Sequence, residues 1–195
     1  MDKKNIPITR EQALDLIKKY NKDKSDINHY LETEAIMGAL AKRLGEDESY
    51  WKMLGLLHDV DWGITKNNMK EHLTKAPEIL KEAGFDEQFI NDVISHGYGW
   101  DCAGLKEKER KEKIEYALAC AETVTGLIHA YALMRKDIKD MDFKGLKKKF
   151  KDKRFAAGVS RDIIVECEKF SLSLDEFFEL SINAIKEIAD EVDLS

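Results

Sequence analysis

Apolar residues recur at helical spacing along most of this chain, and no stretch of useful length alternates between apolar and polar residues. The positions Trp51, Leu54 and Leu57, for example, fall on one face of a helix. Only two prolines, Pro7 and Pro77, interrupt the 195 residues, so few positions break a helix. The sequence therefore predicts an all-α fold.

Helix boundaries are predicted from cap residues. Thr9 is expected to cap the first helix and Gly45 to end the second. Residues 63–70 and 97–104 are expected to be loops. The chain has the length of one domain, and it shows no internal repeat or convincing domain boundary. The predicted helices cover about residues 10–21, 25–44, 47–59, 73–83, 86–96, 107–134, 143–150, 159–170 and 174–192.

Charge and cysteine usage exclude some classes of protein. The net charge of −6 argues against a general nucleic-acid coat, which is normally basic. The chain has three cysteines, Cys102, Cys120 and Cys167, and no CxxC pair. This odd number and spacing disfavour a disulfide framework and a zinc ribbon. No apolar segment follows the polar N-terminus, and no run approaches ~18 apolar residues. We therefore expect a cytoplasmic protein that does not enter a membrane.

The candidate site begins at the doublet His58-Asp59, which lies at the end of an apolar helical run. The chain has five histidines, and four of them fall at the ends of predicted helices or beside loops. A single histidine is more often a packed or surface residue than a ligand. Helix ends can converge on one pocket, however, and imidazole and carboxylate groups together suit a divalent metal. The ordered set is therefore a candidate metal site.

Several short motifs carry a resemblance to a known family. They are Leu56-Leu57-His58-Asp59, His72 followed by Ala76-Pro77-Glu78-Ile79-Leu80, and Ile94-Ser95-His96. In these motifs the chain resembles the HD-domain superfamily of metal-dependent phosphohydrolases, and in particular an HDIG-like subgroup with the ligand order H…HD…H…H…D. The resemblance implies a helical HD fold, with a metal-binding core over about 26–135 and a helical extension over about 140–195.

The resemblance also implies a set of metal ligands. His29, His58, Asp59 and Glu122 would hold one ion, and Asp59, His72 and His96 a second, with Asp59 as the bridge. The metal would be Fe, Mn, Co, Ni or Zn, and one or two ions would bind.

Glu122 departs from the family pattern. The segment Tyr116–Gly126 matches a family motif similar to "ALYACDELTG", and Glu122 stands where that motif has Asp. Its oxygen chemistry is preserved, so we expect it to remain a ligand. The alternative is that Glu122 has lost the metal and only accepts hydrogen bonds.

Two further residues are assigned roles. Asp61 is grouped with His58 and Asp59 as a catalytic residue. Its expected role is to accept a hydrogen bond from a ligand histidine and so orient the ring. It is equally well explained as a polar residue at a helix end. His129 is expected to be structural, because no family motif places a ligand there.

The basic segment "KFKDKRFAAGVSR", residues 149–161, resembles an element of the same subgroup. Lys153, Arg154 and Arg161 are therefore predicted to bind substrate phosphate. The alternative is that the lysines of this region decorate a solvated helix face, since Phe143, Leu146 and Phe150 form an apolar stripe beneath them.

The resemblance implies a phosphohydrolase in which metal-bound hydroxide attacks the phosphoester of a small substrate, with a nucleotide among the candidates. No stable nucleic-acid complex is expected. Two alternatives stay open. A few relatives with the same ligand order are di-iron oxygenases, and Glu122 leaves room for a non-catalytic sensor that binds a nucleotide. The substrate, the metal and the oligomeric state are not predicted.

Overall fold

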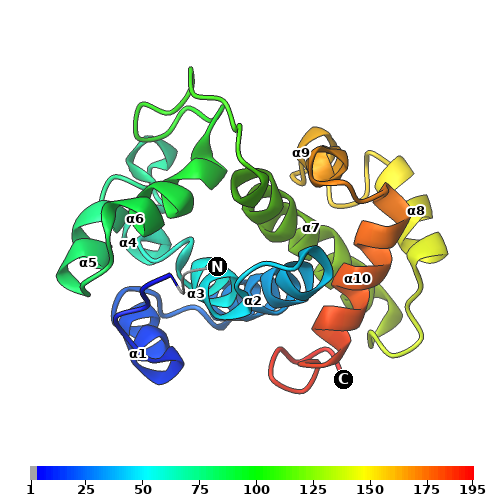
Figure 1. The fold of residues 1–195 in the computed structure, drawn as a ribbon. Coiled ribbons are helices and arrows are strands. Elements are labelled where there is room, and N and C mark those ends of the chain that lie inside the picture. Colours follow the sequence, from blue (N-terminus) through cyan, green and yellow to red (C-terminus); the bar gives the residue numbers. More distant parts are fainter. Residues whose placement is uncertain (1–3) are drawn as a thin grey trace.

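The computed structural model describes residues 4–195, and within them the chain is helical with no strand (Figure 1). The prediction of an all-α fold is confirmed. Residues 1–3, part of the polar N-terminus that indicated no signal peptide, lie outside the described residues.

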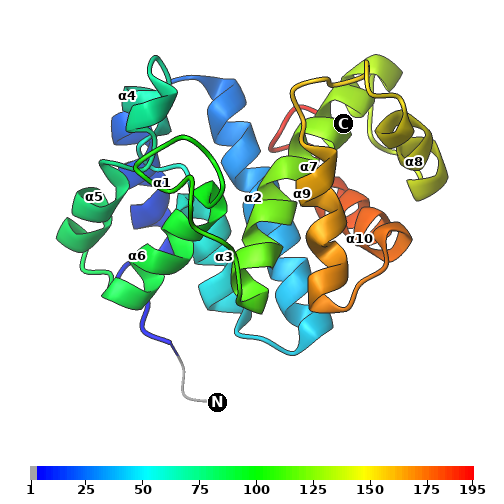
Figure 2. The ribbon, with the colours of Figure 1, turned by 90° about the horizontal axis from the view of Figure 1, so that it is seen from above.

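Two long helices, α2 (Lys24–Leu44) and α7 (Lys113–Arg135), lie side by side at the centre of the molecule (Figures 1 and 2). Helix α2 also packs against α3 (Glu48–Leu57) and α10 (Leu174–Lys186). Apolar side chains of all four helices belong to one continuous core. This central group is the frame on which the candidate site is built.

The remaining helices flank the central pair on two sides (Figure 2). One side holds α1 (Arg10–Tyr20), α4 (Trp62–Thr65), α5 (Ala76–Glu82) and α6 (Glu87–Ile94). The other side holds α8 (Phe143–Lys151) and α9 (Arg161–Val165), next to α10 of the central group. Short 3-10 helices occupy Met69–Glu71, Ser95–Gly97 and Glu166–Phe170. Helices from both the predicted metal-binding core and the predicted C-terminal extension contribute to one apolar core. The boundary between these two parts stays a prediction.

Cap residues place several helix ends as predicted. The Thr9 hydroxyl accepts a hydrogen bond from the Gln12 amide, and Gly45 ends α2 with a left-handed φ of 71°, where glycine carries no steric penalty. The expected start of α7 was wrong by several residues. Residues 107–112 are not helical, and α7 starts at Lys113 because Glu115 accepts the Glu112 amide in a capping box.

Two other boundaries also differ from the prediction. Residues 63–70, expected to be a loop, contain most of α4 and the start of a 3-10 helix. Helix α10 ends at Lys186 instead of continuing to residue 192. Both differences involve short or irregular turns, which apolar spacing does not resolve.

Helix α7 has the length and apolar composition of a membrane-crossing segment, but 67% of its apolar stretch is buried inside the fold. Leu118, Val124 and Leu127 of α7 are fully buried in the core. Its composition is accounted for by its position as a core helix.

Candidate metal centre

Four histidines and one aspartate from separate elements meet at the centre of the fold. His29 lies in α2, His58 follows α3, and Asp59 is the next residue along the chain. His72 follows one 3-10 helix and His96 lies within another. The predicted convergence of helix ends on one pocket is what the structure shows.

The carboxylate of Asp59 lies between two pairs of imidazole rings. Its Oδ1 is 3.3 Å from Nε2 of His72 and 3.1 Å from Nε2 of His96. Its Oδ2 is 3.6 Å from Nε2 of His58 and 3.9 Å from Nε2 of His29. Two potential ligand groups therefore share one carboxylate, and in each group the ligand atoms all lie within 4.8 Å of one another.

The facing nitrogens within each pair have the separation of neighbouring ligands on one ion. Nε2 of His29 is 3.0 Å from Nε2 of His58, and Nε2 of His72 is 3.3 Å from Nε2 of His96. Two ligands that bind one ion at about 2.1 Å are ~3.0–3.4 Å apart when they are neighbours in octahedral or tetrahedral geometry. The rings are thus placed to bind a cation through Nε2.

Hydrogen bonds at the opposite ring nitrogen fix this orientation. An Nδ1 atom beside a carbonyl oxygen must carry the proton, which leaves the Nε2 lone pair free to bind a metal. The acceptors are the Gly55 carbonyl for His58 at 2.8 Å, the Val93 carbonyl for His96 at 2.7 Å and the Thr125 hydroxyl for His29 at 2.8 Å. The Thr125 hydroxyl is free to accept because it donates its own proton to the Glu122 carbonyl at 2.6 Å.

Asp61 lies beside His72, and its predicted role of orienting that ring stays a prediction, because Nδ1 of His72 makes no hydrogen bond with the described residues. Asp61 is fully buried, and its Oδ1 lies 3.3 Å from Nδ1 of His72. The same carboxylate accepts the backbone amides of Leu73 at 3.2 Å, Lys75 at 3.0 Å and Ala76 at 3.1 Å. Asp61 therefore holds the segment after His72, including Leu73 with its left-handed φ of 66°, and caps α5. Its contacts are those of a positioning residue.

The electrostatics of the centre favour a divalent cation. Burial lowers the pKa of His58 to about 3, so this ring is neutral at pH 7 and its lone pair is available. Burial alone would raise the pKa of Asp59, but His58 and His72 outweigh it and hold the pKa well below its usual range. Burial opposes the charged form of His72, but Asp59 and Asp61 outweigh it and raise its pKa to about 10, so a metal ion that binds this ring must displace a proton.

One carboxylate oxygen of the centre lies close to two imidazole rings but has no hydrogen-bond partner among the described residues. Oδ1 of Asp59 is buried and accepts no hydrogen bond from the described residues. A buried carboxylate oxygen without a partner is costly unless a cation binds it. Together with the donor set of imidazole nitrogens and carboxylate oxygens, this observation fits divalent metal ions.

Glu122 lies beside the centre and not within either ligand group formed by the described residues. Its Oε1 accepts a hydrogen bond from the Thr123 hydroxyl at 2.6 Å, and burial raises its pKa. Metal ligation by Glu122 therefore stays a prediction.

The structure does not bring the three predicted phosphate-binding residues into the cavities at the centre. Lys153 and Arg154 are exposed, and Arg154 lies 3.4 Å from Asp152. Arg161 donates to backbone carbonyls of the preceding loop, among them those of Ala156 at 2.6 Å and Val159 at 2.7 Å. Arg161 thus shapes this loop, and phosphate binding by all three residues stays a prediction.

Two cavities open onto the candidate metal centre. One, of about 180 Å³, is lined by Asp59, Trp62, Met69, His72, His96, Gly97, Trp100, Cys102 and Glu122. The other, of about 280 Å³, is lined by His29, Trp100, Glu122, Thr123, Thr125, Gly126, Gly158, Val159 and Ser160. Trp100 and Glu122 line both. Sequence reasoning missed Trp100 and Thr125, although Thr125 lies inside the motif that marked Glu122.

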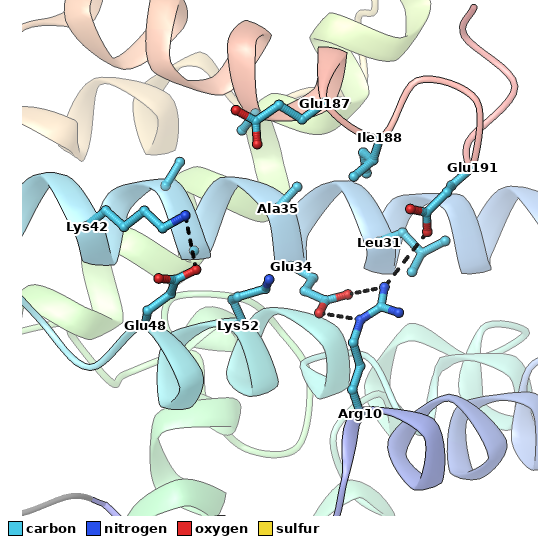
Figure 3. Close-up of a pocket in the computed structure, with 13 residues that line it drawn as sticks. Arg10, Leu31, Glu34, Ala35, Lys42, Glu48, Lys52, Glu187, Ile188 and Glu191 are labelled. Carbon is cyan, nitrogen blue, oxygen red and sulfur yellow. Dashed lines mark hydrogen bonds and ion pairs between the residues drawn. The ribbon is translucent and has the colours of Figure 1, made fainter.

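A separate cavity of about 280 Å³ lies between α1, α2, α3 and α10, away from the histidines (Figure 3). Several of its charged side chains are paired with one another. Arg10 lies 2.7 Å from Glu34 and 3.9 Å from Glu191, and Lys42 lies 3.2 Å from Glu48. These pairs leave little charge for a ligand.

Comparison with known proteins agrees with this geometry. The model of the HD domain family matches residues 26–124, about half of the chain. The chain belongs to the HD superfamily of metal-dependent phosphohydrolases. The matched segment contains all five residues of the two ligand groups, so this HD protein holds its potential ligands where the family match lies.

The curated relatives of this HD protein include Ribonuclease Y of several bacteria. The chain is 27% identical over 172 residues to Ribonuclease Y of Thermotoga maritima, covering 86% of this chain and 32% of the relative. It is 29% identical over 97 residues to Ribonuclease Y of Mycoplasma mycoides, covering 50% of this chain and 18% of the relative. The chain thus spans about a third or less of these relatives. No solved structure matches it.

Proposed function

We propose that this HD protein hydrolyses the phosphoester of a small nucleotide with divalent metal ions held by the two ligand groups. The observation that carries the proposal is the convergence of four Nε2 atoms on the shared Asp59 carboxylate. His29 and His58 would hold one ion with Asp59, and His72 and His96 a second.

When bound, such ions lower the pKa of a water molecule and polarise phosphoryl oxygens. The chain's own residues hold and orient the ligands. Thr125 fixes the ring of His29, and Asp61 lies against the ring of His72 while it holds the following turn. The buried position of His58 keeps its ring neutral at neutral pH.

Two tryptophans that line the cavities at the centre, Trp62 and Trp100, support a nucleotide as substrate. Trp100 is 45% exposed although it lines both cavities at the centre. Trp62 lies edge-on to His72 with ring centroids 5.1 Å apart. An exposed indole next to a metal site offers a stacking surface for a planar base.

The charge of the same cavities supports a small substrate. Within residues 4–195, neither cavity is lined by a lysine or an arginine. Long nucleic acids are bound chiefly through basic side chains that neutralise phosphates, and this chain has a net charge of −6. These features favour a single nucleotide over the RNA that the name of the Ribonuclease Y relatives indicates for those proteins.

Hydrolysis assays across a panel of nucleotides, with Mn, Fe, Co, Ni and Zn added singly, test the proposal. We expect turnover of at least one nucleotide by the wild-type protein. Asp59→Ala, which removes the carboxylate shared by both ligand groups, is expected to remove metal binding and hydrolysis together, and His58→Ala is expected to abolish hydrolysis with loss of the ion of its own group. Val165→Ala, a change at an exposed residue of α9, is the matched control and should retain both. Turnover by metal-free protein contradicts the proposal.

The position of Glu122 favours one alternative. Because Glu122 lies outside both ligand groups, a protein that binds a nucleotide without hydrolysing it is the second candidate. Tight nucleotide binding without product formation across all the added metals selects this alternative.

A further inference from the structure

Two side-chain contacts join α2 to α7 next to the metal centre. In the first, Nδ1 of His29 lies 2.8 Å from the Thr125 hydroxyl. In the second, Nδ1 of His129 lies 2.6 Å from Oε1 of Glu32. The contacts are three residues apart on α2 and four on α7, which is about 4.5–6 Å along each helix. The ring of His129 therefore lies roughly one helical turn beyond the ring of His29.

The second contact is a carboxylate–imidazole pair in which the carboxylate is buried and the imidazole is partly exposed. The Glu32 side chain is 2% exposed, and the described residues give its carboxylate no other ion-pair partner, whereas the His129 side chain is 28% exposed. A buried carboxylate that accepts from Nδ1 fixes the ring and leaves Nε2 on the opposite side. This is the arrangement used to orient acid–base histidines.

His129 lines a cavity that His29 of the metal centre also lines. This cavity, of about 280 Å³, is lined by Ser25, His29, Glu32, Thr125, Gly126, His129, Ala130 and Leu133. His29 also lines one of the two cavities that contain Trp100. A substrate whose phosphate lies at the His29 end has room to extend a group toward His129.

We propose that His129, oriented by Glu32, donates a proton to the leaving group of the phosphoester, an inference that rests on the proposed hydrolase function. A water oxygen forms a bond to phosphorus while the ester P–O bond breaks. The leaving oxygen keeps the bonding electrons and takes the proton from Nε2 of His129. The water releases one proton to solvent, and His129 regains one from solvent, so the protein returns to its starting protonation state.

The charges around His129 favour the form that donates. Glu32 faces the ring from α2, and its hydrogen bond raises the pKa of His129. Asp193, in the C-terminal segment, also contributes to the raised pKa and is itself paired with Lys24 at 2.5 Å. A structural role for His129, as half of an ion pair between two helices, accounts for the contact but not for the shared cavity.

Substrates that differ in leaving group separate the two roles. The experiment measures kcat of the metal-loaded protein for 4-nitrophenyl phosphate, whose phenolate leaves without a proton, and for a nucleoside monophosphate, whose alkoxide needs one. If the protein hydrolyses only diesters, bis(4-nitrophenyl) phosphate and a dinucleotide replace them. His129→Asn is the test variant, because its amide nitrogen takes the place of Nδ1 and still donates to Glu32.

A proton donor is worth about 10²–10⁴-fold in rate. We expect His129→Asn to slow the nucleotide reaction by about 100-fold, and at least ten times more than the nitrophenyl reaction. In the pH profile of kcat, the fall in rate at high pH that reports deprotonation of His129 should disappear. Glu32→Gln should move this fall in kcat to lower pH, because Glu32 raises the pKa of His129. Leu133→Ala, in the same cavity, should change both rates by one common factor.

Three results have defined meanings. If the wild-type protein hydrolyses neither substrate, the result contradicts both the proposed hydrolase function and the proton-donor role of His129. Hydrolysis by wild type with equal losses for both substrates in His129→Asn overturns the proton-donor role and leaves the hydrolase intact. Thermal unfolding of each variant shows whether the fold is retained, and a folded His129→Asn with unchanged rates also overturns the role.

Discussion

The Nε2 atoms of His29 and His58 lie 3.0 Å apart, while Nδ1 of each ring already has a separate oxygen partner. With both Nδ1 atoms protonated, two nitrogen lone pairs face each other across this gap. Lone pairs in that position repel unless a cation lies between them. The hydrogen bonds around the centre thus prepare the rings for a metal.

Thr125→Val tests this preparation. Valine keeps the shape of threonine but removes the oxygen that accepts from Nδ1 of His29. We expect the metal affinity of the His29 group to fall about 10–100-fold, measured by competition with a chelator. Thr33→Val is the matched control, because the Thr33 hydroxyl donates to the His29 backbone carbonyl and not to its ring. Equal affinities for Thr125→Val and wild type contradict this role.

Asp61→Asn tests the segment that carries His72. The asparagine NH₂ replaces an oxygen that accepts backbone amides, so at least one buried amide loses its partner. We expect the free energy of unfolding of the metal-free protein to fall by about 1–3 kcal/mol in urea denaturation. The affinity of the His72 group for metal should fall as well. A change confined to activity, with stability unaltered, argues against the anchoring role.

The sequence was sufficient for the fold class and for the five residues that meet at the centre. Helical spacing and caps such as Thr9 depend on local chemistry, which a single sequence displays. The order of His29, His58-Asp59, His72 and His96 carried the resemblance, and the structure brings these residues together.

Contacts between distant segments were not predictable in the same way. The pairing of Glu32 with His129 joins residues 97 positions apart, and no local pattern marks it. Phosphate binding by Arg161 was predicted from the resemblance of residues 149–161 to a family element and stays a prediction, but its hydrogen bonds to carbonyls that only the folded loop brings near could not be predicted. The exposure of Trp100 likewise depends on how its loop lies against the centre.

Trp100→Ala tests the proposed stacking surface. Loss of base stacking costs about 1–3 kcal/mol, so we expect KM for a nucleoside monophosphate to rise by roughly 5–150-fold. KM for ribose 5-phosphate, which has no base, should change far less. Trp100→Phe should recover part of the loss, and Ile64→Ala, at an exposed residue that lines neither cavity, should have no effect. An equal rise for both substrates contradicts stacking.

The pair of Glu32 and His129 should also make stability depend on pH. Glu32 raises the pKa of His129 in the folded state above its ordinary value of 6.5. The stabilisation is therefore fully present below pH 6.5 and is lost as the pH rises through the folded-state pKa. We expect His129→Asn to destabilise the metal-free protein more at about pH 5.5 than at about pH 9, measured by urea denaturation. A difference that does not vary with pH excludes this coupling.

The metal content of the purified protein tests the central claim most directly. Elemental analysis of protein prepared without chelator and then saturated with one divalent metal should give about two ions per wild-type chain. His58→Ala and His72→Ala should each lower the content by about one ion, because they remove a ligand from different groups. A folded wild-type chain that holds no stoichiometric divalent metal, or variants that hold as much as wild type, would contradict the account.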